Sequence, residues 1–134
     1  METKDLIELA IEAREFAYVP YSNFKVGAVV VTKDGKIFKG CNIESASFTP
    51  TICAERTAIA KAVSEGYREI DTVVVVGSFK KLSYPCGVCR QLIREFGKEI
   101  KIIVAKNVNE FKTYTINELL PESFGPEDIK HEYI

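Results

Sequence analysis

The strongest constraint on the fold is a run of mostly β-branched residues at positions 70–76 (IDTVVVV). A strand that has one face in water alternates apolar and polar side chains, whereas a strand covered on both faces is apolar almost throughout. Positions 100–105 (IKIIVA) have the same character. Two strands of this kind predict a sheet that carries a helical layer on each face.

Hydrophobic spacing and turn residues locate the other elements around these strands. Apolar positions in residues 3–18 recur at helical spacing, and Asp34 and Gly35 predict the tip of a β-hairpin. We expect one domain, residues 1–134, folded as an α/β three-layer α-β-α sandwich with a five-stranded mixed sheet. The remaining expected elements are hairpin strands at 24–32 and 37–41, helices at 53–65 and 86–96, a strand at 111–115, a short capped helix through residue 120, and a tail at 121–134.

Composition and charge narrow the classes of function. The net charge is −1 and the pI about 5.9, which argues against a nucleic-acid polymer as partner because phosphate binding requires a basic face. No apolar run approaches the length of a membrane span. The N-terminal segment is acidic and amphipathic, unlike a signal peptide. We therefore expect a cytoplasmic protein whose four cysteines serve metal binding or catalysis rather than disulfide formation.

Three of the four cysteines lie in two short segments, residues 53–56 (CAER) and 85–89 (PCGVC). Each segment falls at the expected N-terminal end of a helix. Residues three apart share a helix face, so Cys86 and Cys89 can direct their sulfurs at one point. Cys53 supplies the third thiol. Three protein ligands and one open position are the pattern of a catalytic zinc site.

The neighbours of Cys53 suit a site that activates water. Glu55 lies two residues from Cys53, so we expect it to stand beside the metal rather than bind it, within hydrogen-bond reach of the open position. Arg56 lies three residues from Cys53 and is expected beside that thiolate. Zinc with three thiolates carries a net charge of −1. The two helix N-termini contribute about +0.5 each, and Arg56 adds one positive charge, which together restore the potential needed to acidify water.

Two other interpretations of the cysteines remain open on spacing alone. A structural zinc site would require a fourth protein ligand, from Cys41 or His131. A thioredoxin-like dithiol would use only Cys86 and Cys89, but it leaves residues 53–56 without a role. Four further residues also have ordinary interpretations as core, turn or anchoring residues, namely Phe24, Asn42, Glu44 and Phe124.

Five sequence blocks run across nearly the whole chain. In order they are residues 20–28 (PYSNFKVGA), 40–44 (GCNIE), 53–58 (CAERTA), 85–91 (PCGVCRQ) and 119–128 (LLPESFGPED). Together these blocks resemble the cytidine deaminases of the small homotetrameric, three-cysteine zinc class. A zinc centre with three cysteine ligands and a glutamate that does not bind the metal is a known deaminase arrangement.

The resemblance implies an activity and a role for each site residue. The reaction would be zinc-dependent hydrolytic deamination of free cytidine and 2′-deoxycytidine to the uridine products and ammonia, in pyrimidine salvage. Cys53, Cys86 and Cys89 would bind one zinc ion per subunit. Glu55 would be the proton shuttle, and Arg56 would hydrogen-bond the ligand thiolates.

The resemblance also implies how the substrate is held. The residues implied to contact the nucleoside are Phe24, Asn42, Glu44, Ala54 and Phe124. Asn42 and Glu44 would bind the ribose hydroxyls, and Phe24 would stack near the base. Phe124 would reach into the site of a neighbouring subunit, so the protein would be a homotetramer with shared active sites.

Three residues depart from the family pattern. Phe48 stands where tyrosine is common, Tyr84 replaces a small residue before Pro85, and Val88 replaces alanine between the paired cysteines. These departures leave open the ranking of cytidine, deoxycytidine and modified nucleosides. Blasticidin-type deaminases share the zinc motifs and are the alternative within this class, although they are less similar to residues 21–24 and 42–44.

Overall fold

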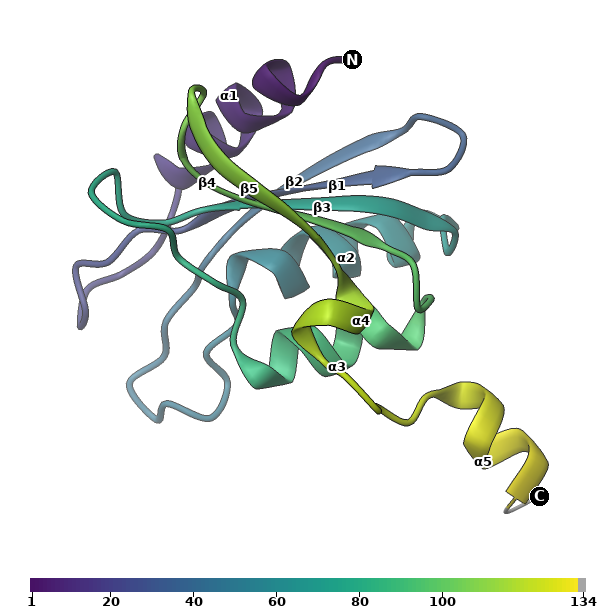
Figure 1. Ribbon diagram of the computed structural model, residues 1–134. Helices are drawn as coiled ribbons and strands as arrows, with labels where there is room; N and C mark the ends of the chain where they lie inside the picture. Colours follow the sequence, from purple (N-terminus) through teal and green to yellow (C-terminus); the bar gives the residue numbers. More distant parts are fainter. Residues whose placement is uncertain (133–134) are drawn as a thin grey trace.

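The computed structural model describes residues 1–132, and one mixed β-sheet lies at its centre (Figure 1). Its strands are β1 (Gly27–Thr32), β2 (Ile37–Cys41), β3 (Ile70–Val76), β4 (Lys101–Asn107) and β5 (Glu110–Thr115). They are arranged in the order β2-β1-β3-β4-β5. β3 and β4 are parallel, whereas the other neighbouring pairs are antiparallel. The expected five-stranded mixed sheet is thus confirmed.

Helices cover the sheet on both faces (Figure 1). α1 (Thr3–Arg14) packs on one face. α2 (Ala54–Ser64) and α3 (Gly87–Glu95) pack on the other. This arrangement is the three-layer α-β-α sandwich that the sequence predicted.

The central strand β3 explains why the run at 70–76 ends in four consecutive valines. Val74 and Val76 are fully buried in the core cluster that includes α1. Val73 and Val75 are buried in the cluster that includes α2 and α3. Successive side chains of a strand point to opposite faces, so the part of a strand that lies between two helical layers requires apolar residues on both faces, whereas Asp71 near the start of the strand is exposed.

The helix α2 lies directly against strand β2, and a glycine makes this approach possible. A Cβ atom at Gly40 would lie 2.5 Å from the backbone nitrogen of Ala58 and 2.6 Å from the carbonyl oxygen of Ala54. No side chain fits between these backbones. The hairpin therefore fixes the position of the N-terminal turn of α2, which carries part of the predicted site.

The first helix is shorter than predicted. It ends at Arg14 rather than near residue 18, because the following backbone pairs elsewhere. The Tyr18 amide donates to the carbonyl of Asn42 at 2.9 Å, and the Glu44 amide donates to the carbonyl of Tyr18 at 2.9 Å. These bonds connect the end of the first helix to the irregular segment that follows β2.

The C-terminal region contains two short helices, of which one was predicted. Thr115 and Glu118 form the expected capping box at the start of α4 (Ile116–Leu119). The expected tail, to which no helix was assigned, contains a further helix, α5 (Pro126–Glu132). Pro126 suits the first position of a helix, where a missing amide proton costs nothing. The last two residues of the expected tail lie outside the described part of the chain.

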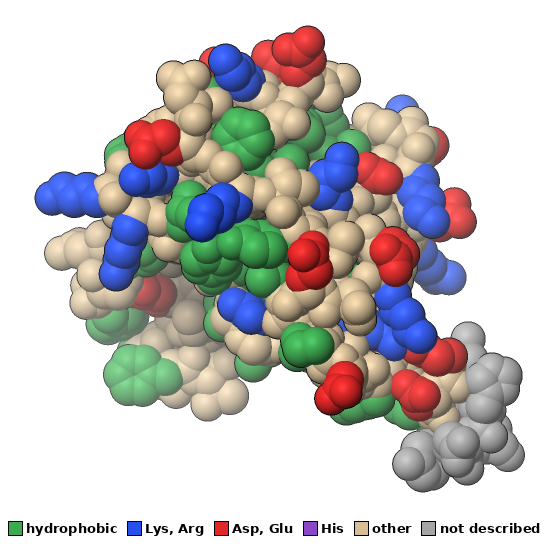
Figure 2. All heavy atoms as spheres, viewed as in Figure 1, with side chains coloured by type: hydrophobic (Ala, Val, Ile, Leu, Met, Phe, Trp, Pro, Cys, Tyr) green, Lys and Arg blue, Asp and Glu red, His purple; other side chains and the backbone are tan. Residues whose placement is uncertain are grey.

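The surface combines charged and apolar side chains. Lys and Arg side chains are interspersed with Asp and Glu side chains over the face in Figure 2, and apolar side chains lie between them. Several aromatic side chains are strongly exposed, among them Phe16, Phe48 and Phe124. Within the described residues, none of the helices combines the length and the apolar character that crossing a bilayer would require.

Candidate active site

The three cysteines of the predicted ligand set meet where two helices begin. Cys53 is the N-cap residue of α2, and Cys86 is the N-cap residue of α3. Cys89 lies in the first turn of α3 and is fully buried. Their sulfur atoms all lie within 4.8 Å of one another, and the Cys53 and Cys86 sulfurs are 3.7 Å apart. The fold therefore positions the three thiols for metal binding.

This donor set fits zinc. A Zn–S bond of about 2.3 Å in tetrahedral geometry separates two sulfurs by roughly 3.8 Å, which agrees with the 3.7 Å between Cys53 and Cys86. Among the side chains that the structure describes, those of residues 1–129, no fourth His, Cys, Asp or Glu joins the cluster. Cys41 lies apart on β2, and the side chain of His131 is outside the described residues. Three sulfurs and one remaining position match a catalytic rather than a structural zinc site.

The electrostatics of the cluster favour a thiolate at Cys53. A hydrogen bond from the Cys89 thiol, supported by the Arg56 guanidinium, lowers the pKa of Cys53 to about 5. The same bond and burial raise the pKa of Cys89. The Nη2 atom of Arg56 donates to the Cys53 sulfur at 3.4 Å, as the three-residue spacing suggested. The buried Nε atom of Arg56 has no hydrogen-bond partner among the described residues, which leaves one more donor beside the sulfurs.

Glu55 is a buried carboxyl group next to the cluster. Its side chain is 3% exposed, and burial raises the pKa of Glu55 to about 7, with the Cys53 thiolate acting in the same direction. Glu55 is absent from the group of ligand atoms that lie within 4.8 Å of one another. This position agrees with the expectation that Glu55 stands beside the metal.

A cavity of about 140 Å³ opens beside the cluster. Cys53, Cys86 and Glu55 form part of its wall. Among the residues predicted to contact the nucleoside, those that line this cavity are Phe24, Asn42 and Ala54. The Cys53 and Cys86 thiols, the Glu55 carboxylate and the apolar ring of Phe24 therefore face one cavity.

Sequence reasoning missed other residues of this wall. Val26, Val75 and Ser83 also line the cavity. Tyr84 lines it too, and the sequence had identified this residue only as a departure from the family pattern, without placing it on the wall. Val75 could not have been separated from the core of β3 by sequence, because it is buried like its neighbours.

The Asn42 side chain lines the cavity and also forms hydrogen bonds with the backbone before β1. Its side-chain oxygen accepts from the Val26 amide at 2.9 Å, and its side-chain nitrogen donates to the Phe24 carbonyl at 2.8 Å. These two bonds hold the segment that leads into β1 and explain why the strand begins at Gly27 rather than at Phe24. Asn42 thus orients the backbone that presents Phe24.

Glu44 belongs to a neighbouring hollow. One carboxylate oxygen accepts from the Tyr21 and Ser22 amides at 3.1 Å each, and the other accepts from the Ser22 hydroxyl. The bond from the Ser22 hydroxyl lowers the pKa of Glu44. Glu44 and Phe48 line a hollow of about 370 Å³. The ionised carboxylate is thereby fixed and still faces open space.

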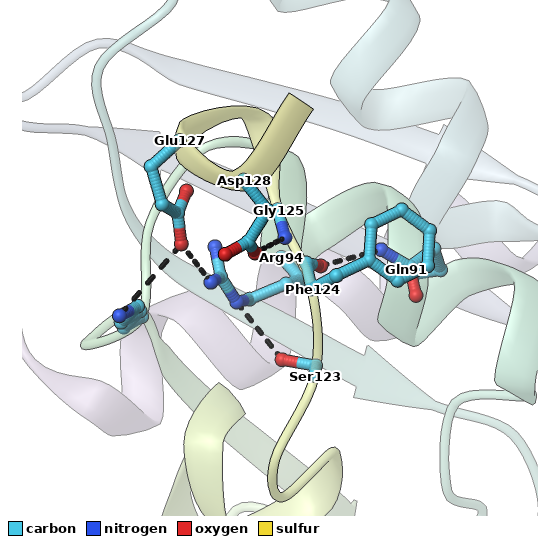
Figure 3. A network of polar contacts seen from close by, with 8 residues as sticks. Gln91, Arg94, Ser123, Phe124, Gly125, Glu127 and Asp128 are labelled. Atoms are coloured by element: carbon cyan, nitrogen blue, oxygen red, sulfur yellow. Dashed lines mark hydrogen bonds and ion pairs between the residues drawn. The ribbon is translucent and has the colours of Figure 1, made fainter. Parts of the chain in front are cut away.

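Phe124 lies away from the cavity, on the segment between α4 and α5 (Figure 3). Gln91 of α3 donates to the Phe124 carbonyl at 3.1 Å. Arg94, which is 3% exposed, donates to Ser123 at 2.9 Å and pairs with Glu127. The Phe124 side chain is 59% exposed and is not part of the cavity wall of its own chain. A network centred on the buried Arg94 thus holds the backbone of the segment that carries an exposed aromatic ring.

Comparison with known proteins agrees with this arrangement. Residues 1–106 match the family model described as the cytidine and deoxycytidylate deaminase zinc-binding region. This match, together with the three-layer fold and the cysteine cluster, defines a zinc-binding deaminase.

Individual relatives specify the family further. The cytidine deaminase of Halalkalibacterium halodurans is 45% identical over 130 residues, covering 96% of this chain and 98% of the relative. The cytidine deaminase of Sporosarcina psychrophila is 42% identical over 132 residues, covering 98% of this chain and 97% of the relative. The crystal structure of cytidine deaminase from Burkholderia pseudomallei aligns with a TM-score of 0.87 at 45% identity, covering 92% of this chain and 100% of that chain. The chain belongs to the cytidine deaminase family.

Proposed function

We propose that this protein deaminates free cytidine and 2′-deoxycytidine hydrolytically, releasing ammonia and the corresponding uridine nucleoside. The observation that carries the proposal is a cluster of three thiols next to a buried glutamate on a cavity of about 140 Å³. Residues 1–134 would act as one catalytic domain. The enzyme would act in pyrimidine salvage and would be located in the cytoplasm.

The chemistry divides between the metal and Glu55. Cys53, Cys86 and Cys89 would hold zinc, which would supply a Lewis acid that activates water. Glu55 would accept one proton from the water as its oxygen bonds to C4 of the cytosine ring, and would deliver this proton to N3. Glu55 would then take the second proton from the hydroxyl group on C4 and pass it to the amine, so that the C4 carbonyl forms as ammonia leaves. Its place on the cavity wall, next to the cluster, gives it access to both partners. Arg56 offsets the negative charge of the thiolates through its bond to Cys53.

The nucleoside would be held by residues of both hollows. Phe24 and Ala54 would contact the base in the inner cavity, where both line the wall. Asn42 and Glu44 would bind the ribose hydroxyls. Each of these two side chains is already fixed by hydrogen bonds to the backbone, so ordering it in the complex would cost little entropy.

A homotetramer with shared sites would give Phe124 its role. The exposed Phe124 ring, on a segment held by the buried Arg94, would enter the site of a neighbouring subunit. Native mass measurement tests this point, because a monomer that is fully active would contradict a shared site.

Replacing Glu55 by glutamine tests the proposed chemistry. Removal of a general acid and base typically costs about 10²–10⁴-fold in rate. We expect Glu55→Gln to lose at least this much kcat while keeping a full complement of zinc, since the carboxyl group is not a ligand. Ammonia release from cytidine and metal content are the measurements. A variant with more than about a tenth of wild-type activity would contradict the role of Glu55.

A second variant separates this proposal from the other interpretations of the cysteines. Cys41→Ser should retain both zinc and activity, because Cys41 lies on β2 outside the cluster. Loss of zinc in that variant would favour a structural site. Purified wild-type protein that reduces disulfides and binds no zinc would favour the dithiol interpretation. Blasticidin-type deamination is not favoured, because the relatives at 42–45% identity are cytidine deaminases.

A further inference from the structure

Tyr84 is a large side chain on the wall of the catalytic cavity. It shares this wall with Glu55 and Cys86, and 42% of its surface is exposed. It belongs to neither the cysteine cluster nor the set of residues assigned to the ribose. Its position directly before Pro85 and Cys86 fixes its backbone next to a metal ligand.

The Tyr84 side chain is held by a tyrosine from the edge of the sheet. The hydroxyl groups of Tyr84 and Tyr114 are 2.9 Å apart. Their rings meet edge to face with centroids separated by 5.8 Å. Tyr114 lies on β5 and packs partly against the core cluster of α2 and α3, and it does not line the cavity. Tyr84 therefore stands against a support that is part of the folded core.

The backbone around Tyr84 is fixed as well. The Ser83 hydroxyl accepts from the Ser78 amide at 3.1 Å, which closes the loop before Tyr84. The Nε atom of Arg14 donates to the Gly77 carbonyl at 2.7 Å at the start of that loop. On the other side, the Pro85 carbonyl accepts from Arg90 at 2.8 Å. The backbone on both sides of Tyr84 is thus held, and a rotation of the side chain would break its contact with Tyr114.

We propose that Tyr84 is a specificity-determining residue, whose ring limits the size of the substituent that a cytosine ring can carry on C5, and that Tyr114 holds the ring in this position. The inference rests on the proposed function. C4 of cytosine has two ring neighbours, N3 and C5. Glu55 serves N3 in the proposed reaction, so C5 faces another part of the wall. We assign that part to Tyr84, because the other aromatic ring on the wall of this cavity of about 140 Å³, Phe24, is already assigned to the base.

The test compares two substrates on the zinc-loaded enzyme. The measured quantity is the selectivity ratio, kcat/KM for 5-methylcytidine divided by kcat/KM for cytidine. One carbon atom in a tight pocket changes kcat/KM by roughly 10- to 200-fold. Tyr84→Ser should therefore raise the selectivity ratio at least about tenfold. Tyr84→Leu, which keeps a larger apolar side chain at this position than serine, should raise the selectivity ratio less.

The support by Tyr114 has its own controls. Tyr84→Phe and Tyr114→Phe each remove the same hydroxyl contact and keep both rings. Each should shift the selectivity ratio in the same direction as Tyr84→Ser, by roughly two- to tenfold, the size of one hydrogen bond. The double variant should shift it no further than either single variant, because only one contact is lost.

The possible outcomes distinguish this inference from the proposed function. An equal fall of kcat/KM for both substrates in Tyr84→Ser and Tyr84→Leu, with the selectivity ratio unchanged, would overturn the specificity role. An additive effect of the two phenylalanine variants would overturn the support by Tyr114. Failure of the wild-type protein to deaminate cytidine would instead contradict the proposed function itself.

Discussion

Replacing Gly40 by alanine should reduce catalysis although Gly40 touches neither metal nor substrate. The new Cβ atom would lie 2.5 Å from the Ala58 nitrogen and 2.6 Å from the Ala54 oxygen. Ordinary contact requires about 3.5 Å, so the two backbones must separate by about 1 Å. Both opposing atoms belong to the backbone of α2, which cannot relax as a flexible side chain would.

The expected magnitudes follow from this displacement. Overpacking of a closed core costs about 1–3 kcal/mol of unfolding free energy, so the midpoint of thermal unfolding should fall by several degrees. Ala54 lies between Cys53 and Glu55 in the chain, so a shift of α2 moves both residues relative to Cys86 and Cys89. A misplacement of about 1 Å can cost roughly 10²-fold in rate, and we expect a loss of that order in kcat/KM.

The assay is cytidine deamination by zinc-saturated protein, with unfolding measured in parallel. Gly87→Ala is the matched control, because it adds the same methyl group where no atom lies within 4 Å. It should keep the wild-type kcat/KM and should leave the unfolding midpoint unchanged or slightly raised, because alanine is a better helix former than glycine. A Gly40→Ala enzyme that is less stable but has wild-type kcat/KM would refute the reasoning, because α2 would then have moved without disturbing the site.

Two further predictions concern charged side chains. The hydrogen bond from Arg94 lowers the pKa of Glu127 to about 2, so this pair contributes stability above the ordinary carboxyl pKa of about 4.5 and loses it as the pH falls toward 2. Urea unfolding should therefore give Glu127→Gln a lower free energy of unfolding than wild type at pH 7, and this difference should shrink below about pH 4.5. A difference that stays constant with pH would contradict a stabilising pair of Arg94 and Glu127. Arg56→Gln should weaken zinc affinity by about 10- to 100-fold in a chelator competition, because Cys53 loses its guanidinium partner, and unchanged affinity would show that the arginine is dispensable.

The parts of this protein that the sequence predicted depend on short-range patterns. The apolar run at 70–76 indicated a strand covered on both faces, and the structure buries it between two helical layers. Spacing of three residues between Cys86 and Cys89 predicted sulfurs that converge, and they lie within 4.8 Å of the Cys53 sulfur. The same rule predicted Arg56 beside Cys53. Helical and strand periodicities are local properties, so one sequence suffices to detect them.

The features that escaped prediction depend on contacts between distant segments. Tyr84 and Tyr114 are 30 residues apart, and their contact follows from the order of strands in the sheet, which local patterns do not specify. The helix α5 lies in the expected tail, to which no helix was assigned, although Pro126 at its start was an available signal. The long-range bond from Arg94 to Ser123 helps to fix the segment before this helix.

The helix α3 connects the two parts of the site. Its N-terminal turn carries Cys86 and Cys89. In the next turn, Arg90 donates to the Pro85 carbonyl and to the Leu119 carbonyl, both at 2.8 Å. One guanidinium group thus joins the loop before the metal ligands to the end of α4.

The same helix holds the segment of Phe124, through the bonds of Gln91 and Arg94 in Figure 3. Because the cysteines and these anchoring side chains share one rigid helix, a displacement of α3 would move the metal ligands and Phe124 together. In the proposed tetramer, Phe124 belongs to the site of a neighbouring subunit. Each α3 would then align the metal ligands of its own site with the aromatic residue of the next, so that correct assembly and correct metal geometry depend on the same element.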